Sequence, residues 1–166
     1  MRNRKGFTLI EITVVLFLLV ILLSLSLPRV RGVLFDDDIE TATAHLGRAV
    51  RTLRNDALLN QVDQYLYLDI AEGKIWRGAA DLSPEKLDEK KERAYRLPGA
   101  VRIADVVTTE KMTSGIAAIL FSRDRYAQPA VIHLVRQNRH RTLVVHPFIR
   151  SIDCYDDYRE IDFETP

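Results

Sequence analysis

The sequence has very little of several features that define common protein classes. It contains one cysteine, Cys154, in 166 residues, which excludes a disulfide framework. Its net charge is only +1, which argues against a general nucleic-acid binder, because such proteins are usually strongly basic. No internal repeat is present, and an apolar content of 47% is too high for a disordered chain. The length is that of one domain, or two at most.

Signatures of catalysis and of metal binding are also missing. The sequence has no nucleophile elbow, phosphate loop or carboxylate pair, and Ser122 and Ser151 have no neighbours that indicate activation. Three histidines, His133, His140 and His146, lack the close spacing of zinc ligands, so isolated strand and turn histidines are favoured over a metal site. We therefore expect no catalytic residues, no metal and no cofactor, and a protein that is not an enzyme.

What the sequence does contain is one long apolar run. Residues Phe7–Leu27 read FTLIEITVVLFLLVILLSLSL, with 16 apolar positions out of 21, and follow Arg2, Arg4 and Lys5. At about 1.5 Å per residue, a helix of this length crosses the ~30 Å hydrocarbon layer. Basic residues before a span keep the short N-terminus in the cytoplasm. The run predicts a single-pass membrane protein whose C-terminal part lies outside the cytoplasm.

A carboxylate, Glu11, lies inside this apolar run. Its insertion costs on the order of 2.5–3.5 kcal/mol at the bilayer centre and less near the interface, so such a residue marks a functional site by default. A cut between Gly6 and Phe7 would create an ammonium group four residues before Glu11, on its own chain or on a neighbour's. A plain signal anchor accounts for the apolar run but leaves the glutamate unexplained. We interpret the basic leader, the Gly6–Phe7 junction, Glu11 and the run as one device.

These residues, RKGFTLIEITVVLFLLVI, resemble the class III signal of type IV pilins and pseudopilins. In that family a prepilin peptidase cuts after the glycine and methylates the new N-terminal phenylalanine. The resemblance implies that Gly6 is the cleavage-site residue, that Phe7 is the methylated N-terminus and that Glu11 is needed for subunit assembly. Pro28 lies where pilins commonly have a helix-disturbing proline, and with Gly32 it predicts a kink or local unwinding within residues 28–35.

The remainder of the chain changes from helical to alternating periodicity. Residues 36–38 are aspartates suited to a helix N-terminus, and an apolar stripe predicts a helix that ends near Asn60. A hairpin is predicted for Tyr65–Ile70 and Lys74–Arg77 around the turn at 71–73. The stripe comprises Ile39, Ala42, Leu46, Ala49 and Leu53, and further strands are expected at Val101–Val107, Ile116–Phe121, Val131–Arg136 and Thr142–His146, with a turn at Gln137–Arg141.

These segments predict an α+β protein in which a long N-terminal helix, membrane-spanning in its first half, packs on an antiparallel β-sheet domain, as in pilins. Residues 83–93 are highly charged and read as an exposed loop or short helix. The expected organisation comprises a prepilin leader at 1–6, a transmembrane and assembly helix at 7–27, an amphipathic continuation at 28–60 and a periplasmic β-rich domain at 61–166.

Two charged regions in the second half allow more than one interpretation. Residues 153–166 hold six carboxylates and one arginine, which favours a solvated acidic tail over a Ca²⁺ site and would also suit a basic partner subunit. Residues 123–150 hold six arginines and one acid, which suits either phosphate contacts or salt bridges between subunits. Cys154, in a compartment that is oxidising, is expected to be buried or to pair with another molecule.

The second half resembles the minor pseudopilins of the GspH type and the related FimT-like minor pilins. The similar stretches are LPGAVRI at 97–103, ILFSRD at 119–124, PAVIHLV at 129–135 and RTLVVHP at 141–147. The resemblance implies a minor subunit at the tip of a type II secretion pseudopilus, anchored in the bacterial inner membrane before assembly. Its implied partners are the prepilin peptidase, the other major and minor pseudopilins and the inner-membrane secretion platform.

Two other functions stay open at this point. A FimT-like minor pilin would act in pilus assembly or DNA uptake, although nucleic acid is not the expected partner. A membrane-anchored sensor that does not assemble would keep its N-terminus uncut.

Overall fold

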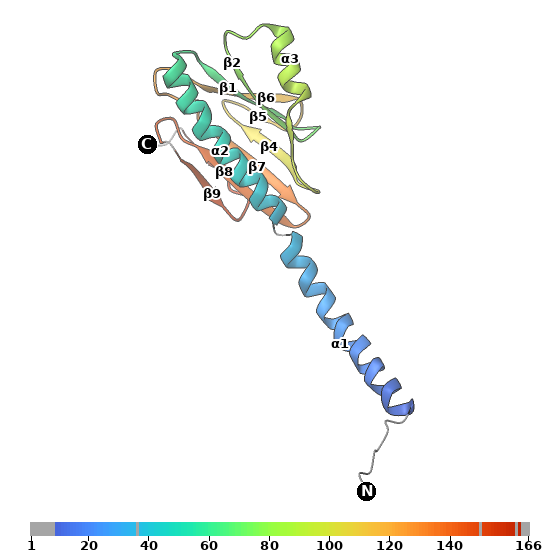
Figure 1. Cartoon of the computed structure of the whole chain (residues 1–166). Coiled ribbons are helices and arrows are strands. Elements are labelled where there is room, and N and C mark those ends of the chain that lie inside the picture. The colour runs from blue at the N-terminus through green and yellow to red at the C-terminus, as the bar shows by residue number, and fades with distance from the viewer. Residues whose placement is uncertain (1–8, 36, 150, 162, 164–166) are drawn as a thin grey trace. The chain divides into compact units, whose positions relative to one another are not determined.

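The structure, a computed structural model, describes residues 9–35, 37–149, 151–161 and 163, and of residues 23–35 and 37 it describes the backbone alone. The chain divides into two compact units, Met1–Asp37 and Asp38–Pro166. The first unit contains helix α1, Leu9–Phe35, drawn in blue in Figure 1. Gly6 and Phe7 lie outside the described residues. Within the described part of the chain, no helix meets the requirements of length and apolarity for crossing a membrane.

Pro28 lies within helix α1, which continues as an α-helix to Phe35. Residues 28–35 are therefore helical rather than unwound. A bend of the helix axis at Pro28 stays a prediction.

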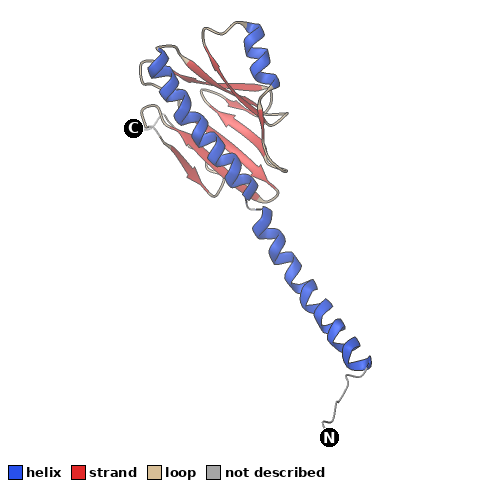
Figure 2. Cartoon of the chain, viewed as in Figure 1, coloured by secondary structure: helices blue, strands red, loops and turns tan. Residues whose placement is uncertain are grey.

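The second unit is α+β, as expected, with helices and antiparallel strands distinguished by colour in Figure 2. Its helices are α2, Asp37–Asn60, and α3, Pro84–Glu92. The strands are β1 Gln64–Asp69, β2 Lys74–Ala79, β3 Tyr95–Arg96, β4 Arg102–Val107, β5 Lys111–Met112, β6 Ile116–Phe121, β7 Ala130–Arg136, β8 Arg139–Val145 and β9 Ile152–Tyr155.

The strands form two sheets rather than the one that the sequence led us to expect. The first has the order β3-β2-β1-β6 and the second the order β5-β4-β7-β8-β9, with every pair antiparallel. The strand β6 causes the division, because its residues 116–121 pair with β1 and not with the strands that flank it in sequence. Strand periodicity identifies a strand but contains no information on its partner.

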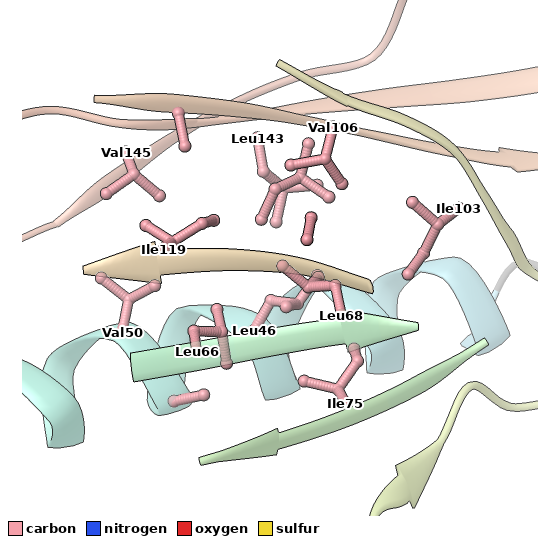
Figure 3. Close-up of a cluster of buried hydrophobic side chains, with 14 of the residues drawn as sticks. Leu46, Val50, Leu66, Leu68, Ile75, Ile103, Val106, Ile119, Leu143 and Val145 are labelled. Atoms are coloured by element: carbon pink, nitrogen blue, oxygen red, sulfur yellow. The ribbon is translucent and has the colours of Figure 1, made fainter. Parts of the chain in front are cut away.

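A single hydrophobic core joins helix α2 to both sheets. Leu46 and Val50 of α2 lie in the same buried cluster as Leu66 of the first sheet and Leu143 of the second, as Figure 3 shows. The predicted apolar stripe is confirmed, since all five of its residues are buried. Burying one such leucine or valine side chain contributes about 1.5–3 kcal/mol. This shared core holds α2 and both sheets together.

Several local predictions are confirmed. Helix α2 ends at Asn60, strands β1 and β2 form the predicted hairpin with Asp69 opposite Lys74, and the charged segment 83–93 contains the short helix α3. The turn predicted for Gln137–Arg141 is shorter than expected, because Arg136 already pairs with Arg139. Gln137 adopts a positive φ of 52°, which a two-residue hairpin turn requires.

Gly99 is a position where the fold needs a glycine. Its φ of 56° lies in the left-handed region, and a Cβ atom there would overlap the carboxylate of Asp38 at the beginning of α2. Asp38 in turn forms an ion pair with Arg136 of β7 at 3.4 Å. The loop before β4 therefore approaches α2 closely.

Candidate functional site

The apolar side chains of α1 are exposed wherever the structure describes them. All residues from Leu9 to Leu22 are exposed, and twelve of them are large hydrophobic residues. Exposed apolar surface of this extent marks a site that contacts another protein or a membrane.

Glu11 is the acidic residue in the first turn of α1 and is exposed. Two residues later, the hydroxyl of Thr13 donates a hydrogen bond to the carbonyl oxygen of Leu9 at 2.9 Å. This bond satisfies the hydroxyl of Thr13 within the helix. Glu11 is then the charged residue among the exposed residues from Leu9 to Leu22, which are otherwise apolar except for Thr13.

In the second unit, a buried polar network holds the C-terminal segment against the second sheet. The carboxylate of Asp105 on β4 lies 2.6 Å from Nδ1 of His133 on β7. On the other side of the ring, Nε2 of His133 lies 2.9 Å from the carbonyl oxygen of Arg159. Each ring nitrogen of His133 therefore lies against an oxygen atom of the same chain.

Tyr158 covers this polar network on the side that faces solvent. Its ring stacks on His133 with centroids 3.9 Å apart, and its hydroxyl donates to Asp105 at 3.2 Å. Lys111 on β5 donates to the Tyr158 hydroxyl at 2.7 Å. That hydrogen bond, together with the charge of Asp105, raises the pKa of Lys111. The side chains of the segment thus cover a buried carboxylate and imidazole.

Two residues of β8 attach the same segment. The hydroxyl of Thr142, which is fully buried, donates to the carbonyl oxygen of Asp157 at 2.6 Å and accepts from the amide of Arg159 at 3.0 Å. Arg141 forms ion pairs with Asp156 at 2.5 Å and with Glu40 of α2. The described carboxylates of residues 153–161 are exposed, as expected for a solvated acidic segment, but the segment is not a free tail. It forms strand β9 and then packs on the sheet, because Thr142 and Arg141 satisfy its backbone and its charge.

The three candidate histidines contact aromatic or acidic side chains in the part of the chain that the structure describes. His133 and His140 both contact the Tyr158 ring, whereas His146 lies 2.9 Å from Asp153. Among the described residues, no group of three or more metal-ligating side chains comes together. The pair of Asp105 and His133 has the composition of a catalytic dyad, but both ring nitrogens of His133 are engaged with oxygens of the same chain rather than facing a substrate.

The arginine-rich region 123–150 is partly neutralised within the molecule. Arg136 pairs with Asp38, and Arg141 pairs with Glu40 and Asp156. These pairs reduce the positive charge that the region presents to a phosphate backbone. Salt bridging is thus one use of the arginines, here within one chain.

Ser122 and Cys154 are two further residues that the sequence brought into consideration. The hydroxyl of Ser122 donates to Asp63 at 3.2 Å in a loop. Cys154 is exposed on β9, the edge strand of the second sheet, so of its two expected alternatives burial is excluded. Pairing with another molecule stays a prediction for this thiol.

Sequence reasoning missed Asp105, Thr142 and Tyr158. Each lies in a segment whose pattern alone does not distinguish it from an ordinary strand or tail residue. To predict that Asp105 lies opposite His133, one needs the register of β4 on β7, and this register contains an irregularity between Ile103 and Asp105. The one signal in the sequence was Asp105 itself, a carboxylate among the apolar residues of a predicted strand.

Comparison with known proteins adds three findings. Residues 1–27 match the family described as the prokaryotic N-terminal methylation motif. No curated protein sequence matches the chain. Among solved structures, the chain is similar to the minor pseudopilin EpsH from the Type 2 Secretion System of Vibrio cholerae, with a TM-score of 0.49 and 8% identity, over 70% of this chain and 95% of that one. The motif match confirms the prepilin-type N-terminus that the sequence predicted.

Proposed function

We propose that this chain is a minor pseudopilin of a bacterial type II secretion system. The observation that carries the proposal is the methylation motif at 1–27, followed by a helix whose described apolar side chains are exposed. A cleavable basic leader and an apolar helix available for packing are the parts that an assembling subunit needs. The folded second unit gives such a subunit a globular head.

In this proposal the precursor is anchored in the inner membrane by Phe7–Leu27, with residues 61–166 in the periplasm. The prepilin peptidase cuts after Gly6 and methylates Phe7. Glu11 then pairs with an N-terminal amine, which offsets the cost of a carboxylate in an apolar environment, on the order of 2.5–3.5 kcal/mol. Apolar helices bundle with those of other pseudopilins, and the inner-membrane platform drives assembly. The subunit has no catalytic role and occupies or initiates the pseudopilus tip.

The decisive experiment is a deletion strain in which secreted enzyme activity is compared between supernatant and periplasm. We expect periplasmic accumulation, reversed by the intact gene but not by Glu11→Ala. The matched control is Glu92→Ala, which removes an exposed glutamate from the end of α3 and should restore secretion. Normal secretion by the deletion strain would refute the proposal and favour the minor pilin of a type IV pilus, including its role in DNA uptake.

Processing is tested separately by the mass of the protein extracted from membranes. We expect the wild type to begin with a methylated Phe7 and Gly6→Val to keep its leader. Glu11→Ala should be cut normally, since its expected defect lies in assembly. An uncut wild-type N-terminus would contradict the site assignment and would favour the membrane-anchored sensor.

A further inference from the structure

A groove of about 630 Å³ lies beside strand β2, between helices α2 and α3. One wall is formed by α2 from His45 to Asp56, which are eleven residues apart. At 1.5 Å per residue this wall is about 16 Å long. The opposite wall is formed by α3, and Arg77 of β2 lies between the two walls. The groove is thus long enough for four or five extended residues at about 3.3 Å each.

The β2 edge in this groove is open. Strand β3 pairs only with Lys74 and Ile75, and the amide of Leu97 donates to the carbonyl oxygen of Gly73 at 2.9 Å. Alternate residues of a strand present their backbone groups to the same side, so Gly73, Ile75 and Arg77 all face this edge. No strand in the described residues pairs with Arg77 there. Its N–H and C=O are therefore in position to pair with an incoming strand.

The groove is positively charged. Four basic side chains line it against two acidic ones, Asp56 and Glu89; the basic residues are Arg77, Lys86, Lys90 and Arg93. Burial, together with the positive charges of the neighbouring Arg48 and Arg77, lowers the pKa of His45 in the lining of this groove.

Aromatic side chains line the same groove. His45 stacks on Tyr95 with centroids 3.6 Å apart. Trp76, which is 6% exposed, has an indole N–H with no hydrogen-bond acceptor among the described residues. The lining therefore combines aromatic surface with positive charge beside an open strand edge, which suits an extended peptide of opposite charge.

We propose that this groove binds an extended acidic segment of another protein, which adds a short strand to β2. Backbone pairing with Arg77 would supply affinity, and the basic side chains of Arg77 and of the α3 wall would select acidic side chains. The acidic C-terminal segment of this chain is not the occupant, because Thr142 and Arg141 hold it on the second sheet. The proposal concerns the second unit alone and does not depend on processing of the N-terminus.

The test uses the full-length chain in detergent micelles and a fluorescein-labelled peptide of seven residues that alternates glutamate with valine or threonine. We expect saturable binding, and at least tenfold weaker binding of the same peptide with lysine in place of glutamate. The double variant Lys90→Glu/Arg93→Glu should lose at least tenfold in affinity. The control Arg102→Glu reverses an exposed charge on β4, outside the groove, and should change affinity less than twofold. Absence of saturable binding, or equal loss in both variants, would overturn the proposal.

Strand pairing is separated from charge by two variants of one residue. Arg77→Gln removes the side-chain charge, whereas Arg77→Pro also removes the backbone N–H that faces the open edge. We expect Arg77→Pro to bind several-fold more weakly than Arg77→Gln. Because proline could disturb the strand, a peptide with alternate N-methylated amides is tested on the wild type and should lose binding at least tenfold. Unchanged affinity of that peptide would refute strand addition.

Discussion

The attachment of the C-terminal segment can be tested at a single hydroxyl. Thr142→Val keeps the shape of the side chain but removes the donor to Asp157 and the acceptor for Arg159, two bonds of 2.6 and 3.0 Å at a fully buried position. At about 1 kcal/mol for each bond, the segment should lose about 2 kcal/mol of local stability. Since 1.4 kcal/mol corresponds to a factor of ten, this loss is about 30-fold in the opening equilibrium.

The assay is hydrogen exchange at the backbone amide of Arg159, which reports local opening. We expect its exchange to accelerate about 30-fold in Thr142→Val. The matched control is Thr43→Val, where a buried hydroxyl donates to the carbonyl oxygen of Ile39 at 2.7 Å, a hydrogen bond within α2. Wild-type exchange in Thr142→Val would refute the reasoning. Equal acceleration in both variants would show a global loss of stability instead.

Three further predictions concern the second unit. Gly99→Ala should destabilise this unit by more than the roughly 1–2 kcal/mol of left-handed backbone strain, because the new Cβ also meets Asp38. The control Gly115→Ala, with a φ of 81° and open space around the Cβ, should show the backbone strain alone. Equal shifts of the thermal unfolding midpoint in the two variants would contradict the clash with Asp38. His45 has a pKa below its usual 6.5, mainly through burial, so the unfolded state binds the proton more readily and stability falls as pH drops below 6.5. Denaturant unfolding of His45→Gln should show a smaller fall, and an equal fall would refute this assignment. Leu46→Ala should cost about 2–5 kcal/mol in the same assay, since Leu46 is fully buried in the shared core, and a loss below 1 kcal/mol would show that the core closes around the gap.

The elements that the sequence predicted well are those with strong local periodicity. The stripe from Ile39 to Leu53 defines the buried face of α2, and the predicted hairpin around 71–73 is present, with Asp69 opposite Lys74. Local pattern and tertiary environment agree in these segments, so each could be identified without knowledge of the rest.

The elements that it missed depend on partners distant in the chain. Strand β9 contains Asp153 and an exposed Cys154, a poor strand pattern, and it is held by pairing with β8. Asp105 and His133 are 28 residues apart and meet only through the register of two strands. Of the candidate site, the N-terminal motif could be predicted because all its residues are contiguous in sequence.

The interleaving of the two sheets determines when this chain can fold. Strands β1 to β3 belong to the first sheet, β4 and β5 to the second, β6 again to the first, and β7 to β9 to the second. Neither sheet is complete before Phe121 has been synthesised, and the second sheet also needs β9 near the C-terminus. Because synthesis proceeds from the N-terminus, the growing chain therefore exposes strands without partners until almost its full length is available. Contacts of such long sequence separation slow folding and favour aggregation of intermediates. Folding of this unit follows completion of the chain, and a truncation after β7 would remove β8 and β9, whose Leu143, Val145 and Ile152 belong to the shared core or pack against it.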